Sequence, residues 1–413
     1  MRIIVWGINY APEVTGIAPC NTALCEYLVA QGNDVEMLTS FAYYPQWKTR
    51  EEDAFTLYRT DRIRGVLVHR CWKYVPQKVS AIRRILHEGS FVAISFLRAL
   101  LLPKADIYVV VSPPLLLGAA AWLLTTIRGS CYHFHVQDLQ PDAAMGLNML
   151  QPGTFTRLLY RLEAFAYRHA TGVSGIGPGM IEAFRKKNVP ENKLALLANG
   201  FDLKAAQTPV AVDFRKKHGF RPDDFLAVYS GNLGTKQGLD ILIDAAQLLH
   251  GNRIHIVICG EGARKSFLEK KLSENKQTHI RLLPLLDDAD YRAMLATANV
   301  CLITQQTGSG NAFLPSKLLT TLAHRRPVLS VADADSALAQ AVAEGDFGIN
   351  LPPDNPSLLA QTLEQFQDDP AQLERYQENG FRYVSRFDHS RVLGEFATQL
   401  AREHSLHYAT PGH

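Results

Sequence analysis

The sequence of 413 residues lacks the features of a membrane-spanning, secreted or redox protein. No apolar run reaches the roughly 18 residues that a spanning helix needs, and the nearest candidate, "PPLLLGAAAWLLTTI", is short enough for a buried helix. "MRIIVWG" enters a strand pattern directly, so no signal peptide is expected. The six cysteines include no CxxC pair, which disfavours metal or redox chemistry and fits a reduced, cytoplasmic setting.

The sequence also has a small net charge and lacks the common dinucleotide-binding motif. A formal net charge of +3 is too small to indicate nucleic acid, and we expect no such partner. The G-x-G-x-x-G fingerprint of a dinucleotide site is missing, because "CGEGARKSF" holds only G-x-G and "GIGPG" also fails it. The acidic "DDAD" at 287–290 indicates a capped helix start instead of a metal site. A nicotinamide enzyme is disfavoured, and neither a metal nor another cofactor is expected.

Apolar strands and helical segments alternate through two successive series. The first opens with "RIIVWG" and "DVEMLTS", and the second, after a polar break near 194–202, opens with "FLAVYSG". Alternation of this kind predicts an α/β fold with parallel sheets covered by helices on both faces. We predict two Rossmann-like, doubly wound domains facing each other across a cleft. The expected boundaries are 1–205 and 206–385, with a helix at 386–413 crossing back to the first domain.

Two loops of the second series have the composition of anion sites. "SGNLGTKQGL" places Gly231 and Lys236 between a strand and a helix, where backbone N–H groups can approach phosphate oxygens. "LPSK" places Ser316 and Lys317 at another helix start, where a cation opposes the helix dipole unless an anion neutralises it. Taken singly, each can also be a plain turn with a solvated lysine. Both follow strands of one sheet, so we expect them at the same edge, binding a diphosphate.

The first series offers fewer candidates. "NYAPEVTGI" places Gly16 at a helix N-terminus, and "FHVQDLQPDAAMG" places His135 and Asp138 at the end of an apolar strand. Asp138 can hold a sugar hydroxyl or a proton there, or simply cap a turn. For His135 a hydrogen-bonded core histidine is the competing interpretation.

Basic residues are dense between Arg59 and His87, where eight lysines and arginines face the single acid Asp61. "SFVAISFLRALLLP" follows them. Cations beside an amphipathic apolar helix are typical of a membrane-surface contact, with a solvated face as the alternative. We therefore expect the segment 59–103 to contact the inner face of the cytoplasmic membrane.

These stretches together resemble family 4 glycosyltransferases of the GT-B fold, and more narrowly the colanic-acid and related exopolysaccharide fucosyltransferase group. The resemblance covers nearly the whole chain in order. It is carried by "GINYAPEVTGI", "YYPQW", "LHEGSFVAISF", "HVQDLQPDAAMGL", "SGNLGTKQGL" and "LPSKLLTTLA". It implies a retaining glycosyltransferase that moves a hexosyl group, fucosyl being one candidate, from a GDP- or UDP-sugar to a polyprenyl-diphosphate-linked glycan.

The resemblance also implies a set of site residues. Lys236 and Lys317 would act on the diphosphate and, with Asp138, form the catalytic set, while His135 and Asp138 would contact the acceptor. The implied donor site comprises Gly16, Gly231, Asn232, Lys236, Gln237, Gly260, Gly262, Leu283, Leu285, Leu314, Ser316, Lys317 and Thr320.

The chain departs from the broad family at two places. Asn232 and Gln237 stand where the family carries an arginine and a lysine, and Ala312 and Thr320 stand where it carries a pair of glutamates. These changes put the usual ribose contact in doubt. They leave two alternatives open, a catalytically weak scaffold at the membrane and a nucleotide-sugar epimerase of the same fold.

Overall fold

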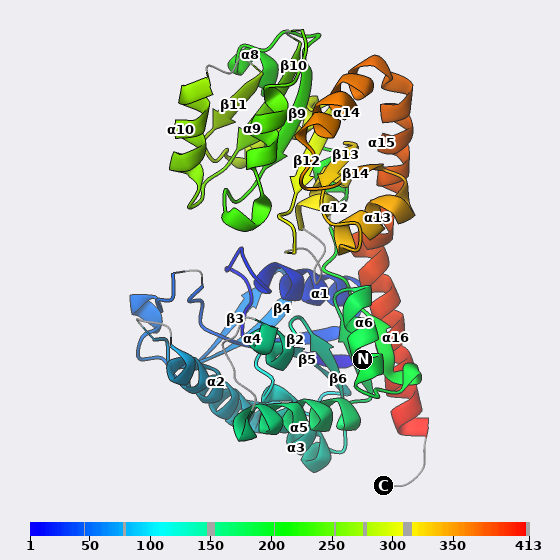
Figure 1. Ribbon diagram of the computed structural model, residues 1–413. Coiled ribbons are helices and arrows are strands. Elements are labelled where there is room, and N and C mark those ends of the chain that lie inside the picture. Colours follow the sequence, from blue (N-terminus) through cyan, green and yellow to red (C-terminus); the bar gives the residue numbers. More distant parts are fainter. Residues whose placement is uncertain are drawn as a thin grey trace. The chain divides into compact units, whose positions relative to one another are not determined.

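The computed structural model divides the chain into two compact units (Figure 1). It describes residues 1–44, 46–76, 80–146, 153–201, 203–251, 253–275, 279–308 and 316–409. Unit 1 contains Met1–Gly200 together with His389–His413, and unit 2 contains Phe201–Asp388. The change of unit thus falls a few residues from the predicted boundaries at 205 and 386. Among the described residues, no helix is long and apolar enough to cross a bilayer.

Unit 1 is built on an eight-stranded sheet in the order β3-β4-β2-β1-β5-β6-β7-β8. All pairs are parallel except β3 with β4. The strands are β1 (Arg2–Trp6), β2 (Asp34–Ser40), β3 (Tyr58–Ile63), β4 (Val66–Cys71), β5 (Ile107–Ser112), β6 (Cys131–Val136), β7 (Gly172–Gly175) and β8 (Leu194–Leu196). The buried runs of β5 and β6 are those of parallel strands covered on both faces.

Helices cover both faces of this sheet. One face packs against α2, α3, α5 and α6, and the other against α1 and α16. The helices are α1 (Ala18–Ala30), α2 (Ala81–Leu101), α3 (Leu117–Arg128), α4 (Gln140–Gly146), α5 (Thr154–His169), α6 (Pro178–Lys186) and α16 (His389–Ala409). The C-terminal helix therefore completes the layer on the α1 side of unit 1.

The β3–β4 hairpin was not predicted, and it corrects part of the interpretation of segment 59–103. Asp61 bonds both Arg59 and Arg70, and Arg70 is only 3% exposed. Lys73 is also buried, and its Nζ bonds Ser40 Oγ and the carbonyl oxygen of Phe41. Arg70 and Lys73 are therefore used inside unit 1 and cannot face a membrane. Lys78 lies outside the described residues.

Unit 2 has a six-stranded parallel sheet in the order β11-β10-β9-β12-β13-β14. Its strands are β9 (Phe225–Ser230), β10 (Ile254–Cys259), β11 (Ile280–Leu283), β12 (Val300–Thr304), β13 (Val328–Val331) and β14 (Gly348–Leu351). Its helices are α7 (Leu203–Ala206), α8 (Phe214–Lys217), α9 (Asp240–Ala246), α10 (Lys265–Asn275), α11 (Asp288–Thr297), α12 (Ser316–Ala323), α13 (Ala337–Gly345), α14 (Pro356–Asp368) and α15 (Pro370–Val384). The order reverses between β9 and β12, which places the switch point of this sheet beside both predicted loops.

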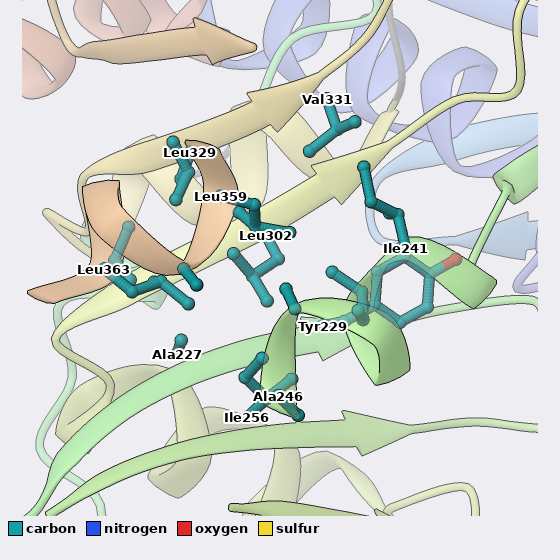
Figure 2. Close-up of a cluster of buried hydrophobic side chains, with 14 of the residues drawn as sticks. Ala227, Tyr229, Ile241, Ala246, Ile256, Leu302, Leu329, Val331, Leu359 and Leu363 are labelled. Atoms are coloured by element: carbon teal, nitrogen blue, oxygen red, sulfur yellow. The ribbon is translucent and has the colours of Figure 1, made fainter. Parts of the chain in front are cut away.

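The core of unit 2 extends up to this edge. Side chains from β9, β10, β12 and β13 pack with α9 and α14 in one hydrophobic cluster. Figure 2 shows Tyr229 at the border of this cluster, beside Ile241, with its hydroxyl directed away from Leu302 and Leu363. The buried strand β9 therefore places the aromatic ring of Tyr229 near its carboxyl end.

Candidate functional site

A pocket of about 660 Å³ opens at the carboxyl ends of β9 and β11 and the start of α12, within unit 2. Ligands of open parallel sheets bind at this position. Its lining consists of Tyr229, Ser230, Gly231, Asn232, Gln237, Leu285, Leu286, Asp287, Asp288, Tyr291, Lys317 and Thr320. The structure thus brings together Gly231, Asn232, Gln237, Leu285, Lys317 and Thr320 of the predicted donor set.

Lys317 occupies the first turn of α12 and reaches back to the end of β9. Its Nζ lies 3.9 Å from the centroid of the Tyr229 ring, and a methyl group built on Gly231 would lie 3.8 Å from the same nitrogen. Burial lowers the pKa of Lys317 to about 7. The proximity of the two loops, predicted from the strand–helix order, is therefore confirmed.

The glycine-rich loop offers fewer backbone donors than expected. The N–H of Gly231 donates to the carbonyl oxygen of Cys259, and that of Leu233 donates to Glu261. These bonds continue the ladder between β9 and β10 beyond the strand ends. Among the described residues, the N–H groups of Asn232 and Gly234 have no recorded partner. The N–H groups of Gly231 and Leu233 are therefore already used and are not available to a phosphate.

Gly260 and Gly262 serve the loop, and neither lines the pocket. A Cβ on Gly260, at φ +151°, would stand 1.9 Å from the carbonyl oxygen of Gly231. One on Gly262 would stand 2.5 Å from that of Leu233. Glycine is required because the two backbones pack directly against each other. These two members of the predicted donor set therefore support the position of the Gly231 loop and do not themselves line the pocket.

The other predicted donor residues fall in different places. Lys236 lies on an exposed 3-10 turn (Thr235–Gln237) and does not line the pocket, so of the two predicted lysines only Lys317 does. Gln237 does line it, and its Oε1 is buried without a hydrogen-bond partner among the described residues. Leu283 ends β11 and lies two residues before the lining residue Leu285.

Three further positions named in the sequence analysis lie at or just before the start of α12 in the sequence. Ser316 begins α12, next to Lys317. Leu314 and Ala312 lie outside the described residues.

The acidic start of α11 behaves as a helix cap. Asp287 Oδ1 accepts a bond of 2.8 Å from the N–H of Asp290, which confirms the capping interpretation of "DDAD". Among the described residues, no group of three or more potential metal ligands is found.

Unit 1 contains the remaining predicted residues. Asp138 is exposed just beyond the carboxyl end of β6, and desolvation raises the pKa of its carboxyl group. Gly16, at φ +65°, precedes α1 and lies against the Tyr44 ring. Their contacts with acceptor and diphosphate remain predictions.

His135 is buried, which argues against its predicted contact with the acceptor. It is 2% exposed, and its ring nitrogens bond Ser174 Oγ at 2.8 Å and Gln137 Nε2 at 2.8 Å. Ser174 also bonds His133, which meets Glu403 of α16 at 3.0 Å. Both ring nitrogens are used within this network, so His135 is a core histidine of unit 1.

Apart from Asp287 and Asp288 of the acidic helix start, four pocket residues escaped the predicted site set, Tyr229, Ser230, Leu286 and Tyr291. Tyr229 is fully buried, and one face of its ring contacts the Lys317 ammonium group. Its Oη donates to the carbonyl oxygen of Asn232 at 2.9 Å. The signal that could have found it is an aromatic residue next to the last position of a buried strand, immediately before a glycine loop.

Comparison with known proteins agrees with this fold. Residues 15–200 match the model of a glycosyl transferase 4-like domain, and residues 212–383 match that of glycosyl transferases group 1. The chain is 33% identical over 349 residues to the putative colanic acid biosynthesis glycosyl transferase WcaI of Escherichia coli (strain K12), which spans 82% of this chain and 85% of that protein.

Solved structures show the same architecture. Anabaena Alr3699/HepE in complex with UDP has a TM-score of 0.66 at 16% identity and covers 97% of this chain and 100% of its own. Sucrose-phosphate synthase from Thermosynechococcus elongatus has a TM-score of 0.68 at 19% identity and covers 99% and 100%. The two parallel-sheet α/β units are those of a GT-B glycosyltransferase.

Within that class the relatives identify a narrower group. The chain belongs to the glycosyltransferase family that joins a 4-like N-terminal domain to a group 1 C-terminal domain. The family predicted from the sequence is confirmed, and the protein is a glycosyltransferase.

Proposed function

We propose that this glycosyltransferase moves a hexosyl group from a nucleotide sugar to a hydroxyl of a lipid-diphosphate-linked oligosaccharide, with retention of configuration. The relative named for colanic acid biosynthesis supports a role in an exopolysaccharide of that type. Solved relatives bound to UDP and UDP-glucose support a nucleotide sugar as donor. GDP-fucose and UDP-sugars are the candidate donors.

The observation that carries the proposal is the environment of the Lys317 ammonium group, which is partly removed from water and lies against the Tyr229 ring. This half-buried cation lies over an aromatic ring, and within the described part of the chain the groups that shift its pKa include no carboxylate. A buried charge is costly unless an anion pairs with it. The diphosphate of a nucleotide sugar would supply that anion in a pocket of suitable size.

The remaining pocket residues suit the other parts of a donor. Leu285, Leu286 and Tyr291 offer an apolar wall for the base. The unpaired Oε1 of Gln237 can accept a hydrogen bond from a sugar or ribose hydroxyl. Thr320, in the place of the second family glutamate, offers a hydroxyl in that region.

The proposed chemistry needs no protein nucleophile. The leaving phosphate accepts the proton of the attacking acceptor hydroxyl on the same face of the sugar, while Lys317 stabilises the negative charge that develops on that phosphate. Asp138 would hold the acceptor in this scheme, and Gly16 would approach the diphosphate from unit 1. We propose the reaction without a metal or other cofactor, so activity should persist in EDTA.

A donor panel tests the proposal. Binding of GDP-, UDP- and ADP-sugars is ranked by thermal shift, and the best donor is then assayed for transfer to lipid-linked acceptors. Lys317→Ala should lower kcat about a hundred- to thousandfold, the usual effect of removing one charge-stabilising group. Lys270→Ala, an exposed lysine of unit 2 outside the pocket, is the matched control.

Three outcomes would oppose the proposal. Normal turnover by Lys317→Ala would remove the assigned role of this lysine. Conversion of the donor without any acceptor would indicate an epimerase. Absence of nucleotide binding in the intact chain would indicate a scaffold that has lost the site.

A further inference from the structure

The turn that carries Asp138 is held on both sides by glutamine residues. The N–H of Gln137 donates to the carbonyl oxygen of Ser112 at 2.9 Å, one residue beyond the end of β6. On the other side, Gln140 Oε1 accepts a bond of 2.9 Å from the N–H of Leu115. Within the described ranges no hydrogen bond of the Asp138 carboxylate itself is found, so its placement depends on these neighbours.

The side chains of Gln137 and Asn199 form a reciprocal amide pair. Gln137 Nε2 donates to Asn199 Oδ1, and Asn199 Nδ2 donates to Gln137 Oε1, both at 3.0 Å. Both side chains are half-buried, and 62 positions separate them in the sequence. Two parallel bonds fix the orientation of the two amides as well as their distance. The pair therefore joins the end of β6 to the segment that follows β8.

Asn199 lies next to the point where the chain leaves unit 1. The first segment of unit 1 ends at Gly200, and the second begins at His389. The two ends of unit 2 are joined to each other there, since the N–H of Phe201 donates to the carbonyl oxygen of Phe387 at 2.9 Å. A cavity of about 20 Å³ is lined by the amide pair together with Gly200 and His389. Both connections between the units thus begin beside the amide pair.

A buried chain of hydrogen bonds determines which way the Gln137 amide points. A carboxylate only accepts, so His133 Nδ1 donates to Glu403 at 3.0 Å, and the Nε2 of the neutral ring accepts from Ser174 Oγ at 2.7 Å. Ser174 Oγ then accepts from His135 Nδ1 at 2.8 Å. Burial lowers the pKa of His135 to about 3 and keeps it neutral, so its Nε2 accepts from Gln137 Nε2 at 2.8 Å. The chain from α16 thereby requires an NH₂ group at this position, which an amide supplies and a carboxylate does not.

We propose that Gln137 and Asn199 are positioning residues of the transfer reaction, because their amide pair fixes the turn that presents Asp138 to the acceptor hydroxyl. Gln137 is covalently joined to Asp138, so a change in its side-chain bonds moves that carboxylate directly. A displacement of about 1 Å at a reacting group can lower a rate about a hundredfold. This role rests on the proposed function, which assigns Asp138 to the acceptor.

Substitutions on both sides of the pair test the role. Gln137→Glu keeps the shape but replaces the NH₂ group by an oxygen, which then faces the acceptors His135 Nε2 and Asn199 Oδ1. Asn199→Ala removes the other half of the pair. Each should lower kcat/KM for the lipid-linked acceptor about 10- to 100-fold. The Kd for UDP or GDP should change by less than about twofold, because sites that share no contacts behave independently.

Two further variants separate positioning from a loss of folded protein. The exchanged pair, Gln137→Asn with Asn199→Gln, contains both amides and should recover activity relative to either single variant. Gln31→Glu makes the same chemical change at an exposed amide of unit 1 and should leave kcat/KM unchanged. Thermal unfolding gives the folded fraction of each variant. Hydrogen exchange, which needs no substrate, should be faster in the peptide of residues 137–140 in both single variants.

Combination with Asp138→Ala shows whether the pair acts through this carboxylate. Asp138→Ala alone should lower kcat/KM for the acceptor, and adding Asn199→Ala should then cost less than about twofold. A further loss of about tenfold in that background would overturn the positioning role, because the pair would act elsewhere. Normal kcat/KM in both Gln137→Glu and Asn199→Ala, or unchanged exchange of residues 137–140, would overturn it too.

Failure of the proposed function gives a different result. Normal transfer by Asp138→Ala would refute the acceptor role of this residue, and the positioning role with it. An impaired Asp138→Ala beside fully active Gln137→Glu and Asn199→Ala would refute the positioning role alone.

Discussion

The Nζ of Lys317 lies 3.9 Å from the centroid of the Tyr229 ring, while Tyr229 Oη bonds the carbonyl oxygen of Asn232 at 2.9 Å. One side chain at the end of β9 therefore contacts the cation and also holds the loop that follows Gly231. The ring supplies a partial substitute for the anion that Lys317 lacks, because the face of an aromatic ring attracts a cation. The following predictions depend on this pair and on the loop beside it.

Nucleoside diphosphate affinity should fall as the pH rises above about 7. The free lysine loses its proton in this range because burial lowers the pKa of Lys317 to about 7, whereas a bound diphosphate favours the charged form. The apparent Kd should therefore rise by up to about tenfold per pH unit, and binding at pH 8 should take up a proton. Titration calorimetry in two buffers of different ionisation enthalpy measures both effects.

Lys317→Arg is the control for this pH dependence. Arginine stays protonated throughout the range, so its affinity should be flat between pH 7 and 9. A wild-type affinity that is equally flat would contradict the assignment of the titration to Lys317.

Replacing Tyr229 should separate its two contacts. Tyr229→Phe keeps the ring beneath Lys317 and should change nucleotide Kd by less than about fivefold, the effect of one neutral hydrogen bond. Tyr229→Leu removes the ring and should weaken binding about 5- to 30-fold, as expected for a desolvated cation–π contact. Thermal unfolding of both variants corrects for any loss of folded protein. Equal effects of the two substitutions would mean that the ring contributes nothing to binding.

Gly260→Ala should disrupt the Gly231 loop, although Gly260 itself does not line the pocket. The new methyl group would stand 1.9 Å from the carbonyl oxygen of Gly231, so the two loops must separate. We expect a loss of about 3 kcal/mol or more in the stability of unit 2, with loss of nucleotide binding. Gly251→Ala controls for backbone strain, because Gly251 has φ +74° and nothing within 4 Å of its Cβ position. That control should cost only about 1–2 kcal/mol and leave nucleotide binding intact.

The stability of unit 1 should fall with pH below about 6.5 because of His135. Burial lowers the pKa of His135 to about 3, so the unfolded chain binds a proton that the folded chain excludes. The stabilising contribution is complete above pH 6.5 and is lost at up to about 1.4 kcal/mol per unit as the pH falls towards 3. Urea unfolding at pH 7, 6 and 5 should show a shallower dependence in His135→Gln. Identical slopes in both proteins would rule out this histidine as the source.

The sequence allowed the position of the pocket beside β9 and α12 to be predicted, but not its detailed contacts. Gly231 and Lys317 could be placed together because both follow strands of one parallel sheet, and the carboxyl ends of such strands share an edge. The bonds that remove Gly231 N–H and Leu233 N–H from ligand binding could not be foreseen, since they depend on the register of β9 against β10.

Contacts between distant parts of the chain also explain the wrong predictions for unit 1. The basic run from Arg59 to Lys73 reads as a surface in the sequence, yet the β3–β4 hairpin places Asp61 between Arg59 and Arg70 and buries the latter. The alternation of side chains along β6 places His133 and His135 on one face of the sheet. It could not show that α16, more than two hundred residues later, covers that face.

The division of unit 1 between the two ends of the chain has a consequence for how the protein is made on the ribosome. Residues 201–388 form a continuous unit and can fold as soon as they have emerged. The first 200 residues must wait for α16, because until Glu403 arrives the imidazole of His133 lacks its carboxylate and the α1 side of the sheet is uncovered. The N-terminal half, although synthesised first, is therefore the last to reach its native state, and it is the part that chaperones have the longest opportunity to bind.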